Sequence, residues 1–269
     1  MTQADQNKSE TDLETNRSDL FLNGKRFLHR RDYPSALRCF KADLEVEGQD
    51  RTLDYRIDLL INIGNIYAQL GEQDRSQTYY QGVLSLQRER NDPHAIGLTL
   101  VNLGNLSREA GHWTRAEAYY LEAEDYIKKA EDTRSLAVLY SNFGLLAQDK
   151  GALDEGIAYL KKAIDLHKET GFEEGLAATW GQLGRLFTKN GNDSNAEICF
   201  NYATTHFGSL GDPMGESEAL RGMAHIYERR GDSELVLRCL SRMMEIHRRF
   251  GLQFPESDQS WLKKLQNEK

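Results

Sequence analysis

Histidine and cysteine are the side chains of this sequence whose spacing could support chemistry. His167 and His247 lie 80 residues apart, and His206 falls one residue short of the midpoint. If each belongs to its own helix pair, packing separates neighbouring pairs by about 10 Å or more, and ligands of one metal ion must all lie at roughly 2 Å from it. We therefore predict no metal site and expect surface or helix-end roles for these histidines.

The three cysteines, Cys39, Cys199 and Cys239, are too few and too far apart for a disulfide framework or a CxxC zinc site. They share one repeat phase with Tyr79 and Tyr159, which predicts a packing role rather than redox chemistry. This cysteine usage also fits a reducing compartment. The sequence also has no GxxxxGK[ST], HExxH or GxSxG motif. We predict a protein that is not an enzyme and binds no cofactor.

Composition limits the classes of partner. The chain has 269 residues, 39% hydrophobic and 28% charged, with a formal net charge of −8 and a pI near 5.5. Nucleic acid and anionic membranes attract clustered Lys and Arg, so an acidic chain favours neither. Residues 1–16 are polar and read as a disordered tail rather than a signal peptide, and no apolar run reaches about 18 residues. We expect a cytoplasmic protein with no membrane insertion.

The elements that position these side chains follow a repeat of 40 residues. A small residue recurs at the first marker, and glycine recurs seven residues later, with Arg31 as the exception. The first marker is Gly24, Gly64, Gly104, Gly144, Gly184 and Ala224, and the second is Gly71, Gly111, Gly151, Gly191 and Gly231. Apolar residues at three- and four-residue spacing flank the second glycine. The pattern predicts six repeats, each made of two helices of about 17 residues.

Each marker has a physical reason. The first lies on the buried face, where a missing side chain lets the paired helix approach, and small residues such as Ala36, Ser76 and Ala116 are expected to face it. Val236, opposite Ala224, is the bulkier exception. The second marker ends the first helix in a left-handed conformation. Asp92-Pro93 and Asp212-Pro213 predict helix N-termini.

The pattern resembles the tetratricopeptide (TPR) signature. The likeness is carried in one repeat by Leu103-Gly104, Gly111, Ala116 and Tyr120. In another repeat it is carried by Trp180, Leu183, Gly184, Phe187, Gly191, Ala196 and Phe200. The 40-residue length is similar to the repeats of Pins/LGN adaptors and kinesin light chains. The resemblance implies an all-α, right-handed helical solenoid over residues 17–250. We expect residues 251–269, with Trp261, Leu262 and Leu265 on one helical face, to cap the stack.

Carboxamides form a row on the first helices. Two residues before the first marker stand Leu22, Asn62, Asn102, Asn142, Gln182 and Gly222, and one residue after it stand Lys25, Asn65, Asn105, Leu145, Arg185 and His225. A primary amide donates and accepts hydrogen bonds, which suits it to the main chain of an extended peptide. In the resembled families such an asparagine ladder holds the ligand backbone. The alternative is that these amides satisfy one another or water.

Cations gather in the last two repeats, at Arg185, Lys189, Arg221, His225 and Arg229. They could pair with an acidic or C-terminal segment of a ligand. The alternative is a solvated face balanced by Glu218 and Glu228. A chaperone-type carboxylate clamp is not reproduced, because the first repeat offers Phe21 and Lys25 where the clamp has a basic residue followed by an amide.

We therefore predict an adaptor or assembly factor that holds an extended or helical segment of another protein in its concave groove. One rival is a signalling sensor resembling the bacterial peptide-responsive TPR regulators, although we expect the short N-terminal tail to leave no room for their effector domain. Another rival is a structural protein that assembles through its exposed ends, which the capping segment argues against. The sequence does not identify the partner.

Overall fold

A computed structural model describes residues 19–45 and 52–267 of the chain. The predicted tail at residues 1–16 lies outside the described residues. Within those ranges the regular secondary structure is helical and contains no strand, as the all-α prediction required. No helix in this part of the chain combines the length and apolar character needed to cross a membrane.

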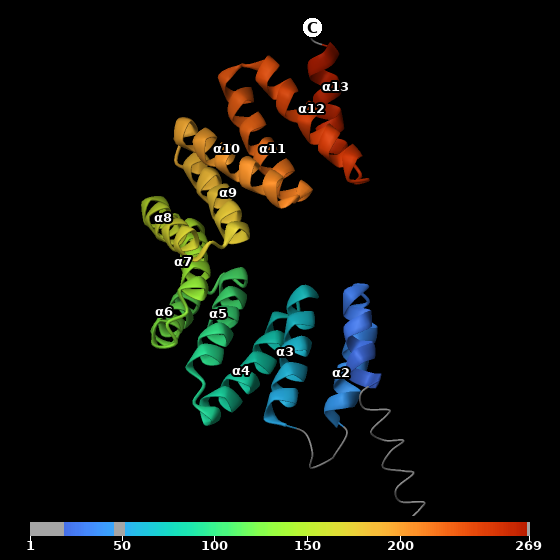
Figure 1. The fold of residues 1–269 in the computed structure, drawn as a ribbon, viewed down its shortest axis with the longest axis vertical. Helices are drawn as coiled ribbons and strands as arrows, with labels where there is room; N and C mark the ends of the chain where they lie inside the picture. The colour runs from blue at the N-terminus through green and yellow to red at the C-terminus, as the bar shows by residue number, and fades with distance from the viewer. Residues whose placement is uncertain (1–18, 46–51, 268–269) are drawn as a thin grey trace, which may run out of the picture. The chain divides into compact units, whose positions relative to one another are not determined.

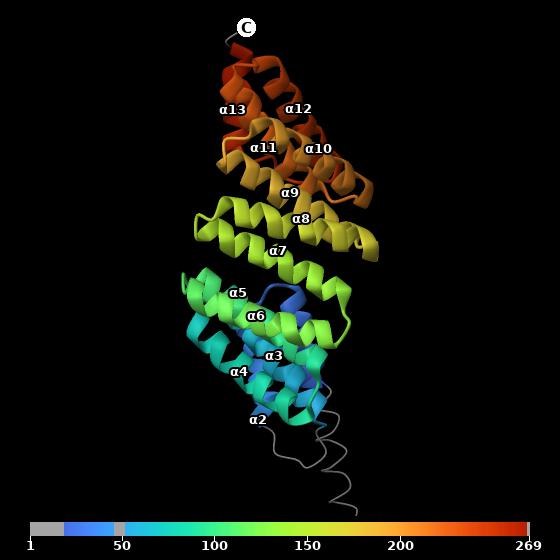
Figure 2. The same cartoon turned by 90° about the vertical axis from the view of Figure 1, so that its left-hand side faces the viewer.

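The chain divides into two compact units, residues 1–130 and 131–269. Each unit contains three helix pairs, so the six predicted pairs are confirmed (Figures 1 and 2). The first unit holds a helix at 19–29, α2 (Tyr33–Glu45), α3 (Leu53–Gln69), α4 (Gln73–Arg90), α5 (Pro93–Glu109) and α6 (Trp113–Lys129). The second holds α7 (Thr133–Asp149), α8 (Leu153–Thr170), α9 (Glu173–Lys189), α10 (Asp193–Leu210), α11 (Pro213–Arg230), α12 (Ser233–Arg249) and α13 (Glu256–Asn267).

Local sequence explains where the helices begin and end. The second marker glycines have φ between 72° and 77°, and Arg31 reaches φ 58° at the equivalent turn. Asp92 and Asp212 accept hydrogen bonds from backbone N–H groups at the starts of α5 and α11, as their Asp-Pro sequences predicted. Left-handed residues therefore end the first helices, and the carboxylate caps of Asp92 and Asp212 begin two of them, α5 and α11.

The first marker glycine is needed most at Gly104. A Cβ atom there would lie 2.3 Å from Cε1 of Tyr120, a buried ring on α6. At the equivalent Gly64 the nearest atom, on Tyr80, would be 3.4 Å away. Ser76 does face its glycine, because its Oγ donates to the carbonyl of Gly64 at 2.8 Å. At Gly104, however, the space is filled by the ring of Tyr120, which lies four residues after Ala116, the small residue predicted to face this glycine.

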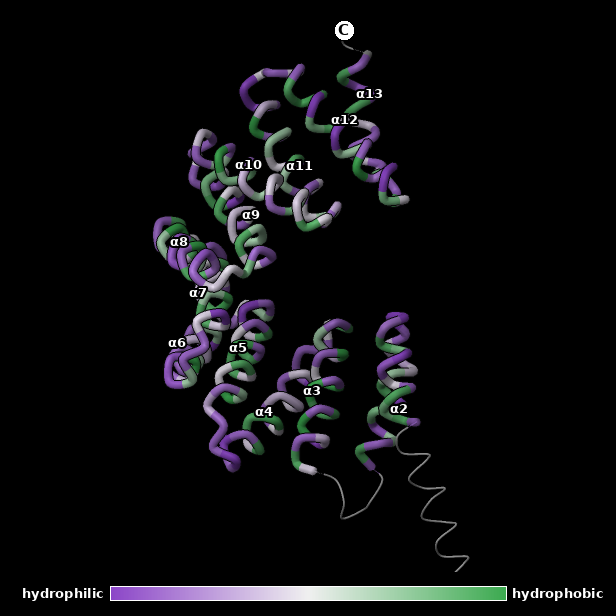
Figure 3. The backbone as a smooth tube through the Cα atoms, viewed as in Figure 1, coloured by the Kyte–Doolittle hydropathy of each residue, from purple (hydrophilic) through white to green (hydrophobic). Residues whose placement is uncertain are grey.

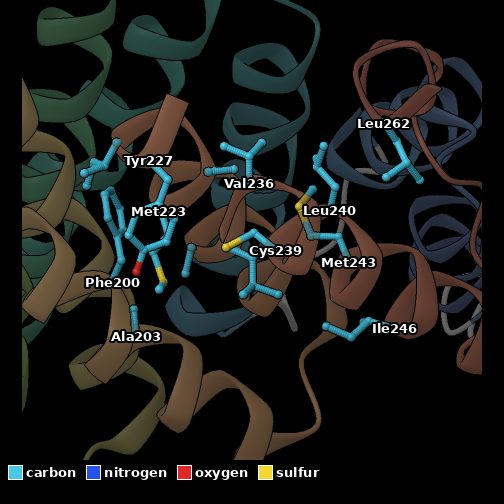
Figure 4. Packing of buried hydrophobic residues seen from close by; sticks show 14 of the residues in the cluster. Phe200, Ala203, Met223, Tyr227, Val236, Cys239, Leu240, Met243, Ile246 and Leu262 are labelled. Carbon is cyan, nitrogen blue, oxygen red and sulfur yellow. The ribbon is translucent and has the colours of Figure 1, made fainter. Parts of the chain in front are cut away.

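Hydrophobic residues recur along each helix and gather where helices meet (Figure 3). In unit two, Met223 and Tyr227 of α11 pack with Val236, Leu240 and Met243 of α12 (Figure 4). Leu262 of α13 joins this cluster and is 6% exposed. The C-terminal segment therefore contributes a side chain to the core, as the predicted cap required.

Candidate peptide-binding site

The first helices of unit two form its inner face. α7 contacts α9 and α9 contacts α11 directly, whereas the second helices α8, α10 and α12 show no comparable contact with one another. Helix pairs that approach more closely on one side curve toward that side. The predicted binding positions of unit two, on α7, α9 and α11, therefore belong to helices that line a concave surface.

In unit one the amide of Asn62 is engaged inside the protein. Asn62 is 6% exposed, its Oδ1 accepts a hydrogen bond from Nζ of Lys25 at 3.0 Å, and its Nδ2 donates to the carbonyl of Asp58 at 2.6 Å. The bond from Lys25 joins the first helix pair to α3, and the bond to Asp58 lies within α3. The structure thus shows a mainly internal use for the first carboxamide of the predicted ladder.

Two further amides are oriented by buried tyrosines that sequence reasoning missed. The hydroxyl of Tyr120 donates to Oδ1 of Asn105 at 2.6 Å, and that of Tyr80 donates to Oδ1 of Asn65. Burial raises the pKa of Tyr80 to about 12, which keeps its hydroxyl protonated as a donor. Asn65 is exposed and Asn105 half-buried, so with Oδ1 occupied each amide has its Nδ2 donors left for a ligand.

A signal for these pairs was present in the repeat. Tyr80 and Tyr120 stand fifteen residues after Asn65 and Asn105, and where asparagine is absent the tyrosine is absent too. The equivalent pairs elsewhere are Lys25 with Phe40, Leu145 with Leu160, Arg185 with Phe200, and His225 with Leu240. A buried phenol requires an acceptor, so the two residue types occur together.

The remaining carboxamides are half-buried: Asn102 on α5, Asn142 on α7 and Gln182 on α9. Oε1 of Gln182 is buried and has no hydrogen-bond partner in the described part of the chain. Gln182 lines a small cavity of about 100 Å³ together with Arg185 and Glu218. An unpaired buried acceptor beside a cavity is available for a donor from outside.

The basic end of the predicted groove forms a real pocket in unit two, with a volume of about 550 Å³. We call it the basic pocket, and its walls are Arg185, Thr188, Lys189, Phe200, Glu218, Arg221, Gly222, His225 and Arg229. Its apolar side is the ring of Phe200, which fills the space that a side chain at Gly222 would need, since a Cβ there would lie 2.5 Å from Cζ. This contact explains why the carboxamide row ends in glycine.

The cations of the basic pocket differ in how firmly they are held. Arg229 donates to Asp193 at 2.5 and 3.3 Å, whereas Arg185 lies 3.9 Å from Glu218 and half of its side chain is exposed. Lys189 is exposed and has no ion-pair partner among the described residues. Lys189 and Arg185 are therefore the charges available to a ligand.

Arg221 and His225, both predicted to bind peptide, contact α13 instead. The Arg221 guanidinium donates from Nε and Nη2 to the Asp258 carboxylate at 2.7 to 3.3 Å. His225 stacks on Trp261, with ring centroids 4.7 Å apart and planes at 21°. Asp258 escaped sequence reasoning, although Asp258 and Trp261 are three residues apart and share one helical face.

The histidines aligned by the repeat contact local side chains and backbone groups. His167 and His247 lie in the last turns of α8 and α12 and are buried, so the helix-end alternative, not the surface one, holds for them. His206 lies 2.9 Å from Glu173. Among the described residues no three His, Cys, Asp or Glu side chains are grouped as metal ligands would be.

Burial dominates the cysteines of unit two. It raises the pKa of the Cys199 thiol to about 12 and that of the Cys239 thiol to about 11. Cys239 packs within the core cluster of α11 and α12, and Cys199 packs in a second cluster around α9, whereas Cys39 on α2 is half-buried. These contacts agree with a packing role.

The stacked helix pairs and their inner face define a helical-repeat protein of the class that binds other proteins. Models of the tetratricopeptide repeat match residues 55–129 and 137–169. These two stretches of the chain are therefore tetratricopeptide repeats. No curated protein matches the sequence significantly. TPR proteins are generally non-catalytic scaffolds, and the likeness to Pins/LGN adaptors stays a prediction.

Solved structures support the same fold. The TPR-containing STAND ATPase PH0952 of Pyrococcus horikoshii superposes with a TM-score of 0.72 at 14% identity, covering 88% of this chain and 36% of that one. The Rap conjugation gene regulator of plasmid pLS20, in complex with the Phr* peptide, gives 0.67 at 14% identity, covering 96% and 75%. A putative kinesin light chain of Podosopora anserina gives 0.59 at 12%, covering 72% and 95%. At these identities the likeness concerns the fold alone.

Proposed function

We propose that this protein is a cytoplasmic adaptor or assembly factor whose inner face binds a carboxylate-bearing segment of another protein. The observation that carries the proposal is the basic pocket, where Lys189 lacks an ion-pair partner in the described part of the chain and Arg185 is loosely held. A carboxylate there would gain charge-assisted hydrogen bonds, and an adjacent apolar side chain would cover Phe200. The protein-binding role of the fold supports the same conclusion.

The half-exposed amides contribute a second recognition element. Asn65 and Asn105 present Nδ2 donors, because tyrosine hydroxyls already occupy their Oδ1 atoms. Such donors suit main-chain carbonyls, which every peptide carries irrespective of sequence. Contacts with these amides of unit one would thus not depend on the ligand's sequence, whereas the charges of the basic pocket in unit two would select acidic segments.

A capture experiment tests the basic pocket. Proteins retained from cell extract by the wild type are compared with those retained by Arg185→Glu/Lys189→Glu and by a matched control, Lys161→Glu/Arg248→Glu, which makes the same charge change on exposed residues of α8 and α12. We expect the pocket variant to lose proteins that the control retains. A synthetic peptide of the captured segment should then bind the pocket variant at least about tenfold more weakly. Equal capture by all three proteins would sink the proposal.

A peptide-responsive sensor is a second candidate, because the Rap regulator that superposes over 96% of this chain was solved with the Phr* peptide. The two functions differ in what a short peptide does. A sensor changes conformation when a free peptide of about ten residues binds, which small-angle scattering would record as a change in radius of gyration. An adaptor binds the same segment without such a change. A mass that rises with concentration in light scattering would instead indicate self-assembly.

A further inference from the structure

Helix α13 lies on the part of α11 where the sequence predicted a ligand. Arg221 and His225 are four residues apart on one face of α11, and they contact Asp258 and Trp261, which are three residues apart on α13. The two contacts are therefore in register along a helix. A guanidinium–carboxylate pair beside an aromatic stack is how a docked helical ligand would be recognised at these positions.

The contacts of α13 are few but specific. The Asp258 side chain is 4% exposed, and its carboxylate faces the Arg221 guanidinium at 2.7 Å. Leu262 of the helix and Phe254 in the preceding segment are the apolar anchors, while Trp261 and Leu265 are only partly buried. By contrast, α11 alone buries eight residues. α13 is thus held against α11 by a polar and an aromatic contact, and its apolar side chains pack in the cluster that α11 forms with α12. It buries fewer of its residues than α11 or α12 does, so it is easier to detach.

Two adjoining pockets show how far α13 reaches. One, of about 530 Å³, lies between α11 and α13 and is lined by Arg221, His225, Glu228, Pro255, Ser257, Asp258 and Trp261. The other is the basic pocket, which shares Arg221 and His225 but has no α13 residue in its walls. A segment docked like α13 but carrying a further carboxylate directed at the basic pocket would also meet Lys189 and Arg185.

We propose that α13 is a built-in pseudo-ligand of the inner face, displaced by a partner helix that carries a carboxylate, an aromatic residue three positions later and an additional acidic residue for the basic pocket. The proposal deepens the proposed function, on which it rests, by naming the partner's pattern. Attachment within the chain gives α13 a local concentration in the millimolar range, and a partner overcomes it through the extra ion pairs. The affinity measured for a partner is then proportional to the fraction of chains whose site is vacant, so a smaller vacant fraction gives weaker apparent binding.

The test uses a labelled synthetic peptide of residues 254–267 and the full chain. In Asp258→Asn/Trp261→Ala, which we call the anchor variant, the two side chains of α13 that contact Arg221 and His225 are changed while α11 is unchanged. Because its site is vacated, we expect this variant to bind the peptide at least tenfold more tightly than the wild type in fluorescence anisotropy. Adding Arg221→Glu should abolish that binding, and a peptide carrying the same Asn and Ala changes should not bind.

Hydrogen exchange separates a displaceable ligand from a structural cap. For a displaceable ligand, the anchor variant exchanges faster in α13 while α11 and α12 stay protected. Loss of protection throughout α11 and α12 would mean that α13 is only a cap and would overturn the proposal. So would equal peptide binding by wild type and variant, no binding to a folded variant, or dimerisation through exchanged α13 helices. If the peptide fails while Arg185→Glu/Lys189→Glu still loses its partners, the proposed function stands without this inference.

Discussion

The two units use the same repeat position in opposite ways. In two of the three helix pairs of unit one the residue after the first marker is asparagine, Asn65 or Asn105, and a buried tyrosine hydroxyl fixes its amide, whereas the first pair has Lys25. In unit two the equivalent residues are Leu145, Arg185 and His225, paired in the repeat with Leu160, Phe200 and Leu240. A phenol under the inner face demands an acceptor above it, whereas a hydrocarbon makes no such demand. Replacing tyrosine in unit two therefore leaves the position free to carry charge.

The largest expected effect tests how tightly the tyrosine closes unit one. Gly104→Ala places a methyl group against the ring of Tyr120, which is fully buried and tethered by its hydroxyl, so the ring cannot move aside cheaply. We expect a loss of about 3 kcal/mol in the free energy of unfolding, the upper end for overpacking. Urea denaturation followed by circular dichroism measures it.

Gly64→Ala is the matched control for that change. Its Cβ meets Tyr80 only at ordinary contact distance, 3.4 Å, and alanine favours the helix over glycine by about 1 kcal/mol. We expect this variant to be as stable as the wild type or slightly more stable. If both alanine variants lost the same stability, ring proximity would not explain the glycine at position 104.

An intermediate effect tests the dependence of tyrosine on asparagine. Asn105→Leu removes the Oδ1 atom that accepts a hydrogen bond from the buried Tyr120 hydroxyl, which should lower the free energy of unfolding by about 2 kcal/mol. The double change Asn105→Leu/Tyr120→Leu copies the Leu145 and Leu160 pair of unit two and removes both polar groups. Part of the lost stability should return in chemical denaturation. The pairing would be refuted if the double variant lost more free energy of unfolding than the two single changes lose when added together.

The smallest effect depends on pH and on a position where the units also differ. His167 is buried in unit two, where unit one has Gln87 and Ile127. Burial, and secondarily the nearby Arg134, lowers the pKa of His167 below its usual 6.5. The unfolded chain then binds the proton more readily, so this contribution to stability is present above pH 6.5 and is lost as the pH falls below it.

His167→Gln should flatten that part of the stability profile, because glutamine does not titrate and Gln87 already occupies the equivalent buried position. Melting temperatures of wild type and variant between pH 5 and 8 are the measurement. The variant should lose less stability than the wild type between pH 6.5 and 5. Parallel profiles would assign the acid sensitivity to other groups.

The repeat and its turns could be predicted because their signals are local. Glycine at Gly71 or Gly191 is required by the backbone of its own turn, and Asp92 and Asp212 cap helices that begin one residue later. Each such requirement is met within a few residues. The pairing of helices then followed from apolar spacing on both sides of the turn.

The occupancy of the site could not be predicted in the same way. Arg221 and Asp258 are 37 residues apart, and whether Arg221 faces a ligand or α13 depends on where the last helix docks. The sequence showed that Trp261 and Leu262 form an apolar face but not which α11 side chains that face would cover. Asn62 is similar, because its partner Lys25 belongs to the preceding repeat.

The cysteines provide a means of timing how the protein opens. A thiol reacts with maleimide as its thiolate, and burial keeps Cys199 and Cys239 protonated and inaccessible at neutral pH. Half-buried Cys39 is the most accessible of the three and should react first, whereas the other two react only when unit two opens. Intact-mass spectrometry during alkylation therefore counts the thiols that have opened, and peptides from a digest assign them, with Cys239 reporting on the cluster of α11 and α12 and Cys199 on the neighbouring cluster around α9.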